Sequence, residues 1–257
     1  MSFHTLKTSG SSLKNIQFGI DAVSHNIANI NTTGFKKQQV NYEAVVNSSN
    51  RLGEGLSGTA LNATTTVFSQ GDIKPTGTFT DLAIQQEGFF SLQNSAGEIV
   101  YSRAGHFLTD SNRTMVDPSG NFLMSINGDR ITIPANAHEV EISVNGEVNV
   151  AFDDITGFQP YDQIQLATFI NPTGLEHIGG NNYRESVASG SPNFSTAGQT
   201  GSQTSQTGIV SGALEFSNTN LSESLTDLMA YQRSYQAISR TTTTADEILQ
   251  TTINLGN

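Results

Sequence analysis

The 257-residue sequence contains no cysteine. This absence excludes disulfide bonds, thiolate nucleophiles and thiolate metal sites. Tryptophan is also absent, which argues against the exposed aromatic platform expected of a carbohydrate-binding module. No apolar run approaches the roughly 20 residues of a membrane span, so we expect no direct membrane insertion.

Charged side chains are scarce as well. They make up 14 % of the residues, with a net charge of −11 and a pI near 4.7. A protein with a net negative charge repels the phosphate backbone of nucleic acids, so we expect no nucleic-acid partner. Ser, Thr, Asn, Gln and Gly are abundant instead. Such a surface suits a subunit packed among copies, and it is also common in secreted β-rich proteins.

The N-terminal segment has a helical period. Apolar residues recur at steps of three and four, which predicts one narrow apolar stripe of the kind that a second helix covers. The stripe consists of Leu6, Leu13, Ile16, Ile20, Val23 and Ile27. The segment lacks the basic and apolar regions of a secretory signal peptide, so any export is expected to follow another route.

The helix is predicted to end where small polar residues and glycine follow the stripe. Their side chains compete for backbone hydrogen bonds, and Gly34 permits a positive φ. The run carries Asn26, Ala28, Asn29, Asn31, Thr33, Gly34, Phe35 and Lys36. This Ala-Asn-x-Asn-x-Thr-Gly-Phe-Lys pattern resembles the N-terminal signature of the bacterial flagellar rod and hook proteins.

A second long helix is predicted near the C-terminus. Asn220 and Glu223 have the spacing of a capping box, and neither Pro nor Gly interrupts the sequence before Gly256. A helix from Leu221 to Asn254 would be roughly 50 Å long, more than a small domain buries. We take its stripe to include Leu221, Leu225, Leu228 and Tyr235. The short step at Tyr231 interrupts the heptads and would locally overwind a coiled coil.

Further motifs resemble the same family. Gly212-Ala-Leu-Glu-Phe and Leu228-Met-Ala-Tyr-Gln-Arg-Ser-Tyr235 are similar to its C-terminal motif, and Tyr101-Ser-Arg-x-Gly105 is similar to part of its β domain. Gly174-Leu-Glu-x-Ile-Gly179 resembles the rod branch, particularly its distal-rod members. The segment between Phe35 and Gly88 is shorter than in enterobacterial distal-rod proteins, so proximal-rod and short hook-type assignments stay open.

The middle of the chain has the period of strands. Short apolar runs alternate with turn residues, and Asn127-Gly128 and Asn145-Gly146 indicate hairpins with positive φ at both turn residues. The runs cover 66–69, 82–85, 89–93, 99–103, 106–109, 122–126, 131–133, 140–144, 148–152 and 164–170. We therefore predict an α+β protein with terminal helices that form a coiled-coil-like domain around a central antiparallel β domain.

The expected organisation follows from these patterns. Residues 1–36 form the N-terminal helix and signature turn, 37–63 an extended linker or arm, and 64–188 the antiparallel β domain. Residues 189–208, rich in Ser, Gly, Thr and Gln, form a flexible return strap, and 209–257 carry the C-terminal helix that completes the core domain.

No motif in the sequence indicates a catalytic reaction. The five histidines are scattered without metal-pair spacing, and no phosphate-binding loop or nucleophile elbow is present. Asp110-Ser-Asn-Arg-Thr114 superficially resembles a calcium loop, but Met115 occupies the position that needs glycine, and a hairpin turn explains it better. We expect no catalytic, cofactor or metal site.

The resemblance implies a structural subunit of the flagellar axial structure, in the basal-body rod and exported uncleaved by the flagellar type III apparatus. Its partners would be further copies of itself, in a helical polymer that transmits torque, and neighbouring rod and hook proteins. The sequence leaves two alternatives from other classes: a secreted β-domain adhesin trimerised by its coiled coil, and a hydrolase with a noncontiguous site.

Overall fold

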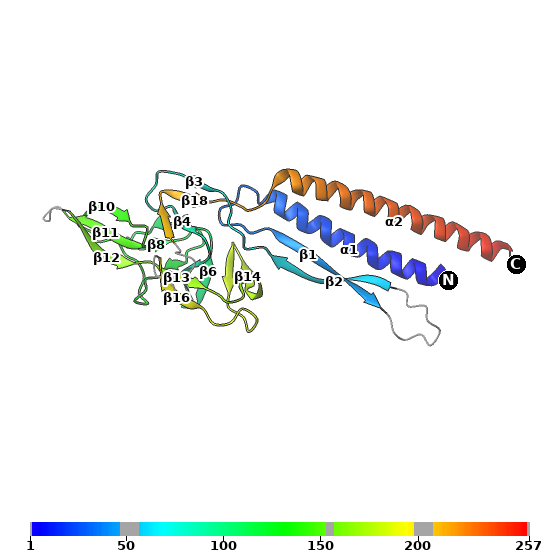
Figure 1. Ribbon diagram of the computed structural model, residues 1–257, viewed down its shortest axis with the longest axis horizontal. Coiled ribbons are helices and arrows are strands. Elements are labelled where there is room, and N and C mark those ends of the chain that lie inside the picture. Colours follow the sequence, from blue (N-terminus) through cyan, green and yellow to red (C-terminus); the bar gives the residue numbers. More distant parts are fainter. Residues whose placement is uncertain (1, 47–56, 153–156, 198–207, 256–257) are drawn as a thin grey trace. The chain divides into compact units, whose positions relative to one another are not determined.

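The computed structural model describes residues 2–46, 57–152, 157–197 and 208–255, and only the backbone of residues 2–7, 44–46 and 57–62. Helix α1 spans Ser2–Ala28 and helix α2 spans Leu221–Leu255, with the strands between them (Figure 1). The predicted α+β class, with helices at both ends of an antiparallel β protein, is confirmed.

The chain forms two compact units. We call the first the helical unit; it comprises Met1–Ile30, Lys37–Val67 and Thr219–Asn257. The second, the β unit, comprises Asn31–Lys36 and Phe68–Asn218. The chain therefore passes between the units four times, and the first passage falls inside the signature segment.

The helical unit contains a strand pair as well as the two helices. Strand β1 (Gln38–Val46) pairs antiparallel with β2 (Ser57–Thr66), and both contact α1, which also packs along α2. The segment 37–63, which the sequence suggests is a linker or arm, is thus mostly part of this ribbon. Strand β2 reads Ser-Gly-Thr-Ala-Leu-Asn-Ala-Thr-Thr-Thr. Threonine favours strands through its branched Cβ, yet it is polar and gives no apolar alternation to detect.

The start of α2 shows the Asn220 half of the predicted capping box. The Asn220 side-chain oxygen accepts hydrogen bonds from the backbone N–H of Ser222 (2.9 Å) and of Glu223 (3.3 Å). The Glu223 carboxylate lies 3.6 Å from the Lys37 ammonium. The cap satisfies two amides that the first turn of a helix leaves without partners.

The β unit is built from antiparallel pairs throughout the described residues. Its largest sheet has the order β14-β15-β6-β5-β9-β8-β7, with β13 joining β5 and β16 joining β13. A second sheet has the order β10-β11-β12, and two further pairs are β4-β17 and β3-β18. The bounds are β3 Ile73–Pro75, β4 Leu82–Gln85, β5 Phe89–Gln93, β6 Ile99–Ser102, β7 Leu108–Thr109, β8 Met115–Val116, β9 Phe122–Leu123, β10 Ala137–Ile142, β11 Glu147–Phe152, β12 Phe158–Gln163, β13 Gln165–Thr168, β14 Glu176–Gly179, β15 Asn182–Arg184, β16 Asn193–Thr196, β17 Gly208–Ser211 and β18 Ala213–Glu215, with a 3-10 turn at Pro172–Gly174.

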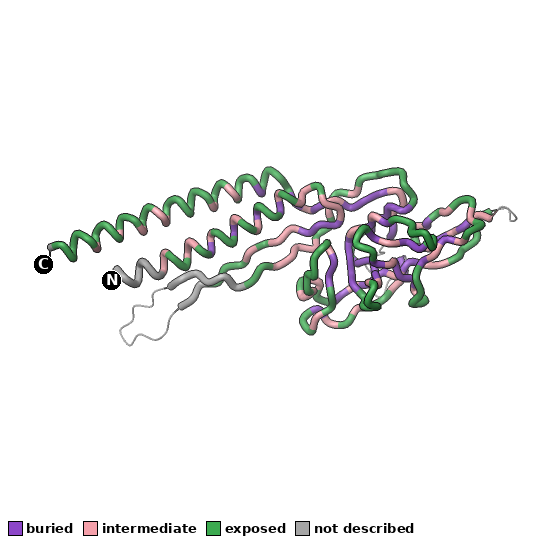
Figure 2. The backbone as a smooth tube through the Cα atoms, turned by 180° about the vertical axis from the view of Figure 1, so that it is seen from behind, coloured by how far each residue is buried: buried purple, intermediate pink, exposed green. Residues whose placement is uncertain are grey.

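Most of the predicted strand runs lie on these strands. The runs 82–85 and 89–93 coincide with β4 and β5, whereas β2 ends at Thr66 and leaves 67–69 outside any strand. The run 131–133 contributes only the isolated bridge from Thr132 to Thr114. The core beneath these strands is a continuous apolar cluster that includes Leu82, Phe90, Phe107, Ile164 and Ile209. Figure 2 shows the buried segments of the β unit in purple.

The two Asn-Gly turns differ in detail from the prediction. Gly128 and Gly146 have φ of 85° and 76°, but neither Asn127 nor Asn145 has a positive φ. In the second turn Gly146 N–H donates to Ser143 O and Ser143 N–H donates to Glu147 O. These are three-residue loops with glycine in the left-handed region, so only one residue of each turn needs it.

Asp110–Thr114 makes the same pattern of turn hydrogen bonds, with Arg113 at φ 60°. The interpretation of this segment as a hairpin turn is therefore confirmed. The Arg113 guanidinium donates to the carbonyls of Pro134 and Ala135, both at 2.9 Å, which holds the non-glycine residue in place.

Two expected boundaries are corrected by the strands near the C-terminal end. Strand β16 lies inside the expected flexible strap, because Asn193–Thr196 pairs with β13; residues 198–207 of the strap lie outside the described residues. Strands β17 and β18 pair with β4 and β3, so residues 208–215 complete the β unit instead of joining the terminal helix. Short strands such as Ala213-Leu-Glu215 carry too few residues to show a period of two.

Two glycine variants give a matched test of the loop geometry. A Cβ at Gly128 would meet no atom within 4 Å, so Gly128→Ala should lower the free energy of unfolding only through the strain of a left-handed backbone, by about 1–2 kcal/mol. Gly146→Ala has the same strain, and its Cβ would also lie 3.1 Å from Ile209 Cδ1, so we expect a larger loss. Urea unfolding of the purified variants measures both. An equal effect of the two would show that the core at Ile209 accommodates the methyl group freely.

Candidate assembly surface and signature segment

The end of α1 is tied to the start of β1 by one side chain. The Asn26 amide donates to Gln38 O and its carbonyl accepts from Gln38 N–H, both at 2.8 Å. Asn26 is 6 % exposed, so these bonds are shielded from water. The Asn26 side chain thus bonds to both the N–H and the carbonyl of Gln38, as a neighbouring strand would. These bonds fix the chain where it enters the β1–β2 ribbon.

The helix ends as the signature predicts. Asn29 N–H and its side-chain amide both donate to His25 O, at 3.2 and 2.9 Å. Beyond the helix, Gly34 has a φ of 68° and donates to Glu215 O at 2.8 Å. A Cβ on Gly34 would lie 2.3 Å from Ala104 N, so only glycine fits there. Thr33 O accepts a hydrogen bond from the Asn181 amide.

The remaining signature residues differ in exposure. Phe35 is buried, at 4 % exposed, and Asn31 and Ala28 are exposed. Lys36 is among the largest fully buried side chains of the β unit. A buried ammonium has to find partners, because an unpaired charge away from water is strongly unfavourable.

Lys36 finds that partner in Glu215. The ammonium lies 2.6 Å from Glu215 Oε1 and donates to Ser69 O at 2.7 Å. The second carboxylate oxygen accepts from Arg103 Nε at 2.6 Å. Gly71 N–H also donates to Oε1, at 2.9 Å. The side chains of Lys36, Arg103 and Glu215 are 1 %, 4 % and 0 % exposed, so we name them the buried charge cluster.

Arg103 carries the cluster further into the β unit. Its guanidinium donates to the backbone carbonyls of Ile84, Gln86 and Gly88. Gln86 has a φ of 70°, and these bonds hold that turn. The five N–H groups of a guanidinium suit this task, because they can serve a carboxylate and several carbonyls at once.

Burial lowers the pKa of the Lys36 ammonium from its ordinary value of 10.5, and the nearby Arg103 lowers it too. The Glu215 carboxylate acts in the opposite direction, but desolvation is the larger effect. The charged ammonium is therefore held at some cost to the folded protein.

The cluster joins three separate stretches of sequence. Lys36 ends the N-terminal signature, Arg103 lies in Tyr101-Ser-Arg-x-Gly105, and Glu215 lies in Gly212-Ala-Leu-Glu-Phe. Sequence reasoning found the three motifs but not their contact. The available signal was a charged residue inside each motif of a chain that has few charges.

The buried row of α1 differs from its apolar stripe. The most buried positions are Asn15, Gly19, Val23 and Asn26, and of these only Val23 belongs to the predicted seam. A Cβ on Gly19 would lie 2.6 Å from Tyr42 Oη and 2.7 Å from Tyr231 Cε1. Glycine here lets a tyrosine from β1 and one from α2 meet over the helix.

The two tyrosines also bond to each other and to the helix. Tyr42 Oη donates to Asn15 O at 3.1 Å. Burial and the hydrogen bond with Tyr231 raise the pKa of the Tyr42 phenol. Polar contacts thus account for much of how the helices and ribbon pack within one chain.

The rest of the predicted seam is only partly covered. Leu13, Ile16, Ile20 and Ile27 are half-buried, and the side chain of Leu6 lies outside the described residues. On α2, Leu228 is half-buried, whereas Leu221, Leu225 and Tyr235 are 45 %, 43 % and 42 % exposed. Figure 2 shows α2 exposed over most of its length. Met229, Ile248 and Ile253 on the same helix are exposed as well.

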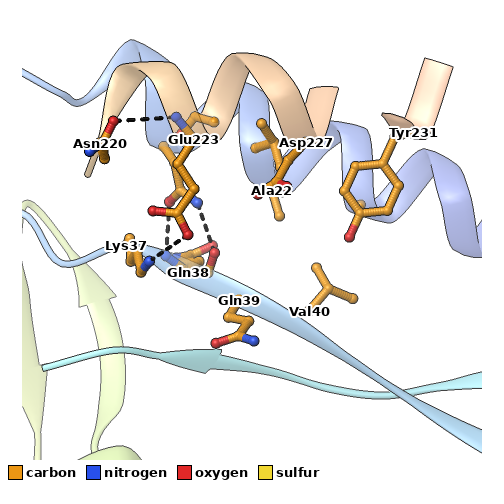
Figure 3. Close-up of a pocket in the computed structure, with 13 residues that line it drawn as sticks. Ala22, Lys37, Gln38, Gln39, Val40, Asn220, Glu223, Asp227 and Tyr231 are labelled. Carbon is orange, nitrogen blue, oxygen red and sulfur yellow. Dashed lines mark hydrogen bonds and ion pairs between the residues drawn. The ribbon is translucent and has the colours of Figure 1, made fainter. Parts of the chain in front are cut away.

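A hollow of about 230 Å³ lies where α1, α2 and β1 meet (Figure 3). Glu223, Asp227 and Tyr231 line it from α2, and Gln38 and Val40 line it from β1. No other copy of the chain is needed to form it. Its mouth is polar and carries two carboxylates, one of which, on Glu223, faces Lys37.

The histidines do not assemble a site in the part of the chain that the structure describes. His106 Nδ1 lies 2.7 Å from Asp81 Oδ1, and the two residues form one strand bridge. Within residues 2–46, 57–152, 157–197 and 208–255, no group of three or more His, Asp or Glu is placed to hold a metal ion. Neither described helix has the length and apolarity needed to cross a bilayer.

Family models match three parts of the chain. Residues 6–36 match a model described as flagella basal body rod protein, 83–150 the flagellar hook protein FlgE/F/G D1 domain, and 210–255 the flagellar basal body rod FlgEFG protein C-terminal. Each match contains one member of the buried charge cluster.

Similar proteins match nearly the whole chain. The flagellar basal-body rod protein FlgG of Bacillus subtilis is 36 % identical over 95 % of this chain and 96 % of its own length. FlgG of Caulobacter vibrioides is 34 % identical (97 % and 98 %), and FlgG of Borreliella burgdorferi is 32 % identical (97 % and 97 %). The chain belongs to the flagellar basal-body rod protein family. The predicted resemblance to the rod branch, particularly its distal-rod members, is confirmed.

The central carboxylate gives the sharpest test of the cluster. Glu215→Gln would leave Lys36 and Arg103 buried without a counter-charge, and we expect it to lower the free energy of unfolding by about 3–5 kcal/mol. The control is Lys37→Met, which removes the partly exposed Lys37–Glu223 pair and should change stability by about 1 kcal/mol or less. Chemical denaturation compares them. Similar small effects for both variants would contradict a central role for Glu215.

Lys36 also predicts a pH dependence. Its pKa is lowered on folding, so just below pH 10.5 the unfolded chain binds more protons than the folded protein, and Lys36 makes stability rise with pH there. The difference in unfolding free energy between wild type and Lys36→Met should therefore shift in favour of wild type as the pH approaches 10.5. Lys37→Met should keep the wild-type slope. Parallel profiles for wild type and Lys36→Met would refute the shift.

Proposed function

We propose that this chain is a structural, non-enzymatic subunit of the distal flagellar rod that polymerises through its two terminal helices. The observation that carries the proposal is the apolar surface of α2, where large side chains stay 42–63 % exposed from Leu221 to Ile253. A monomer gains nothing from this arrangement, whereas a polymer covers it with the helices of neighbouring copies.

The proposed contact is a coiled-coil-like seam between copies. On α1 it uses Leu13, Ile20 and Ile27, which the chain's own elements cover only in part. On α2 it uses Leu221, Leu225 and Tyr235. Narrow heptad stripes favour pairing of this kind. Repetition of one heterologous contact then yields an open helical tube, with the β unit as a further layer.

The location and partners follow from the family. As a rod subunit the chain would lie in the basal body, contact neighbouring rod and hook proteins, transmit torque and leave the cell through the flagellar export apparatus. The similar proteins of Bacillus subtilis and Borreliella burgdorferi are basal-body rod proteins, which supports this location. A proximal-rod or hook-type position in the same structure is the alternative.

A deletion and a matched pair of variants test the proposal in a motile bacterium that carries this chain. Deletion should remove the hook and leave a short or missing rod, as seen in electron micrographs of isolated basal bodies. Complementation with Leu225→Gln/Met229→Gln should fail to restore most rods. Each lost contact is worth about 1 kcal/mol, and together they raise the concentration required for assembly about 30-fold.

Thr226→Gln is the control, because it places the same side chain on the same exposed turn of α2 without removing apolar surface. It should restore rods as wild type does. A complete rod without a hook in the deletion strain would identify a hook-type subunit. Intact flagella would refute a rod function and favour the adhesin alternative.

A further inference from the structure

Two loops of the β unit carry the same dipeptide. Asn127-Gly128 and Asn145-Gly146 each lie in a three-residue loop, with the asparagine exposed and the glycine at a positive φ. Asparagine is chemically labile, and most so before glycine, because glycine has no Cβ to obstruct the approach of its backbone nitrogen to the asparagine side chain. The surroundings of the two dipeptides in the fold differ, which gives them different reactivities.

The reaction is deamidation. The backbone nitrogen of the glycine loses its proton and forms a bond to the asparagine Cγ, the Cγ–Nδ2 bond breaks, and ammonia leaves a succinimide ring in the chain. Water then opens the ring, at the side-chain carbonyl to give aspartate or at the main-chain carbonyl to give isoaspartate. The net change is one amide and one water converted to one carboxylate and one ammonia. The glycine nitrogen must therefore turn away from its hydrogen-bond acceptor and toward the side chain.

The Asn145–Gly146 peptide is held on both sides. Gly146 N–H donates to Ser143 O at 2.8 Å, and the Asn145 carbonyl accepts from the Gln163 side-chain amide at 3.2 Å. The Gly146 carbonyl accepts from Ile164 N–H at 2.8 Å. Because Gly146 is also buried, rotation of this peptide would break these bonds and disturb the core.

The Asn127–Gly128 peptide is held less firmly. Gly128 N–H donates to Ser125 O at 3.0 Å, and Asn127 N–H donates to Ser125 Oγ at 3.3 Å. Among the described residues, none donates to the carbonyl of Asn127 or of Gly128. Gly128 is exposed, and a Cβ there would meet no atom within 4 Å. Local opening of this loop therefore breaks fewer hydrogen bonds and displaces no core side chain.

We propose that Asn127 is a site of spontaneous deamidation in the folded protein, and that the fold protects Asn145. This inference does not depend on the proposed function, because it concerns the β unit of a single chain. The product places a new carboxylate two residues from Asp129. Isoaspartate also adds one methylene to the backbone of the loop that the bond from Ser125 N–H to Asp129 O, 2.8 Å long, closes. The modification thus loosens this loop.

Tryptic mapping measures the two sites separately. Cleavage after Arg113, Arg130 and Arg184 places Asn127 in peptide 114–130 and Asn145 in peptide 131–184. The purified full-length chain is incubated at mildly alkaline pH, digested at intervals and analysed by mass spectrometry, with fragment ions to assign the changed residue. A sample digested at once supplies the baseline.

We expect Asn127 to react about tenfold faster than Asn145 in the folded chain, because two further hydrogen bonds protect Asn145. In chain unfolded by urea the two sites should react at similar rates. The residues before them, Ile126 and Val144, are both β-branched, so the local sequences are closely matched.

A matched pair of variants gives a second measurement. Glutamine keeps the amide but has to close a larger ring, so it reacts more slowly. Asn127→Gln should remove most of the isoaspartate that the folded chain forms, as measured by methylation with an isoaspartate methyltransferase and a labelled methyl donor. Asn145→Gln should leave the amount unchanged.

Two kinds of result would overturn the inference. One is an equal rate at the two sites of the folded chain, or a faster reaction at Asn145. The other is a folded chain that keeps both amides while the chain in urea loses them, because the loop of Asn127 would then be as well protected as the loop of Asn145.

Discussion

One buried carboxylate organises the β unit. Glu215 balances the charges of Lys36 and Arg103 and accepts the Gly71 amide, while its backbone carbonyl holds Gly34. Charged side chains that are shielded from water need partners of opposite charge, because a single unpaired buried charge lowers the stability of the folded protein by several kcal/mol. The ion pairs join residues 31–36, the residue that directly follows β6, and the last residue of β18. The signature glycine and lysine are thus two parts of a single connection.

The helical unit is packed mainly through polar and small side chains of α1. Within one chain α1 packs mainly through Asn15, Gly19, Val23 and Asn26, a row in which polar and small residues outnumber apolar ones. Its apolar stripe lies beside that row and is only half covered. The helix thus has one face that packs within its own chain and a second, more apolar face that stays partly exposed.

Local patterns in the sequence predicted the parts of the fold that depend on local chemistry. The Asn220 cap, the end of α1 and strands such as Leu82–Gln85 follow from side chains within a few residues of each other. The threonine-rich β2 and the short β18 could not be found in this way, because their order comes from distant partners. The buried charge cluster and the meeting of Tyr42 with Tyr231 over Gly19 depend on contacts that no spacing in the sequence encodes.

The distances along the chain within the cluster bear on when the β unit can fold. Glu215 is 179 residues from Lys36 and 112 from Arg103. A chain that is synthesised from its N-terminus therefore contains Lys36 and Arg103 long before Glu215. Strands β3 and β4 are likewise made long before their partners β18 and β17. Closing such long loops is slow, and burying two cations early is unfavourable. The β unit is therefore complete only when residues close to the C-terminal end of the chain take their places in it.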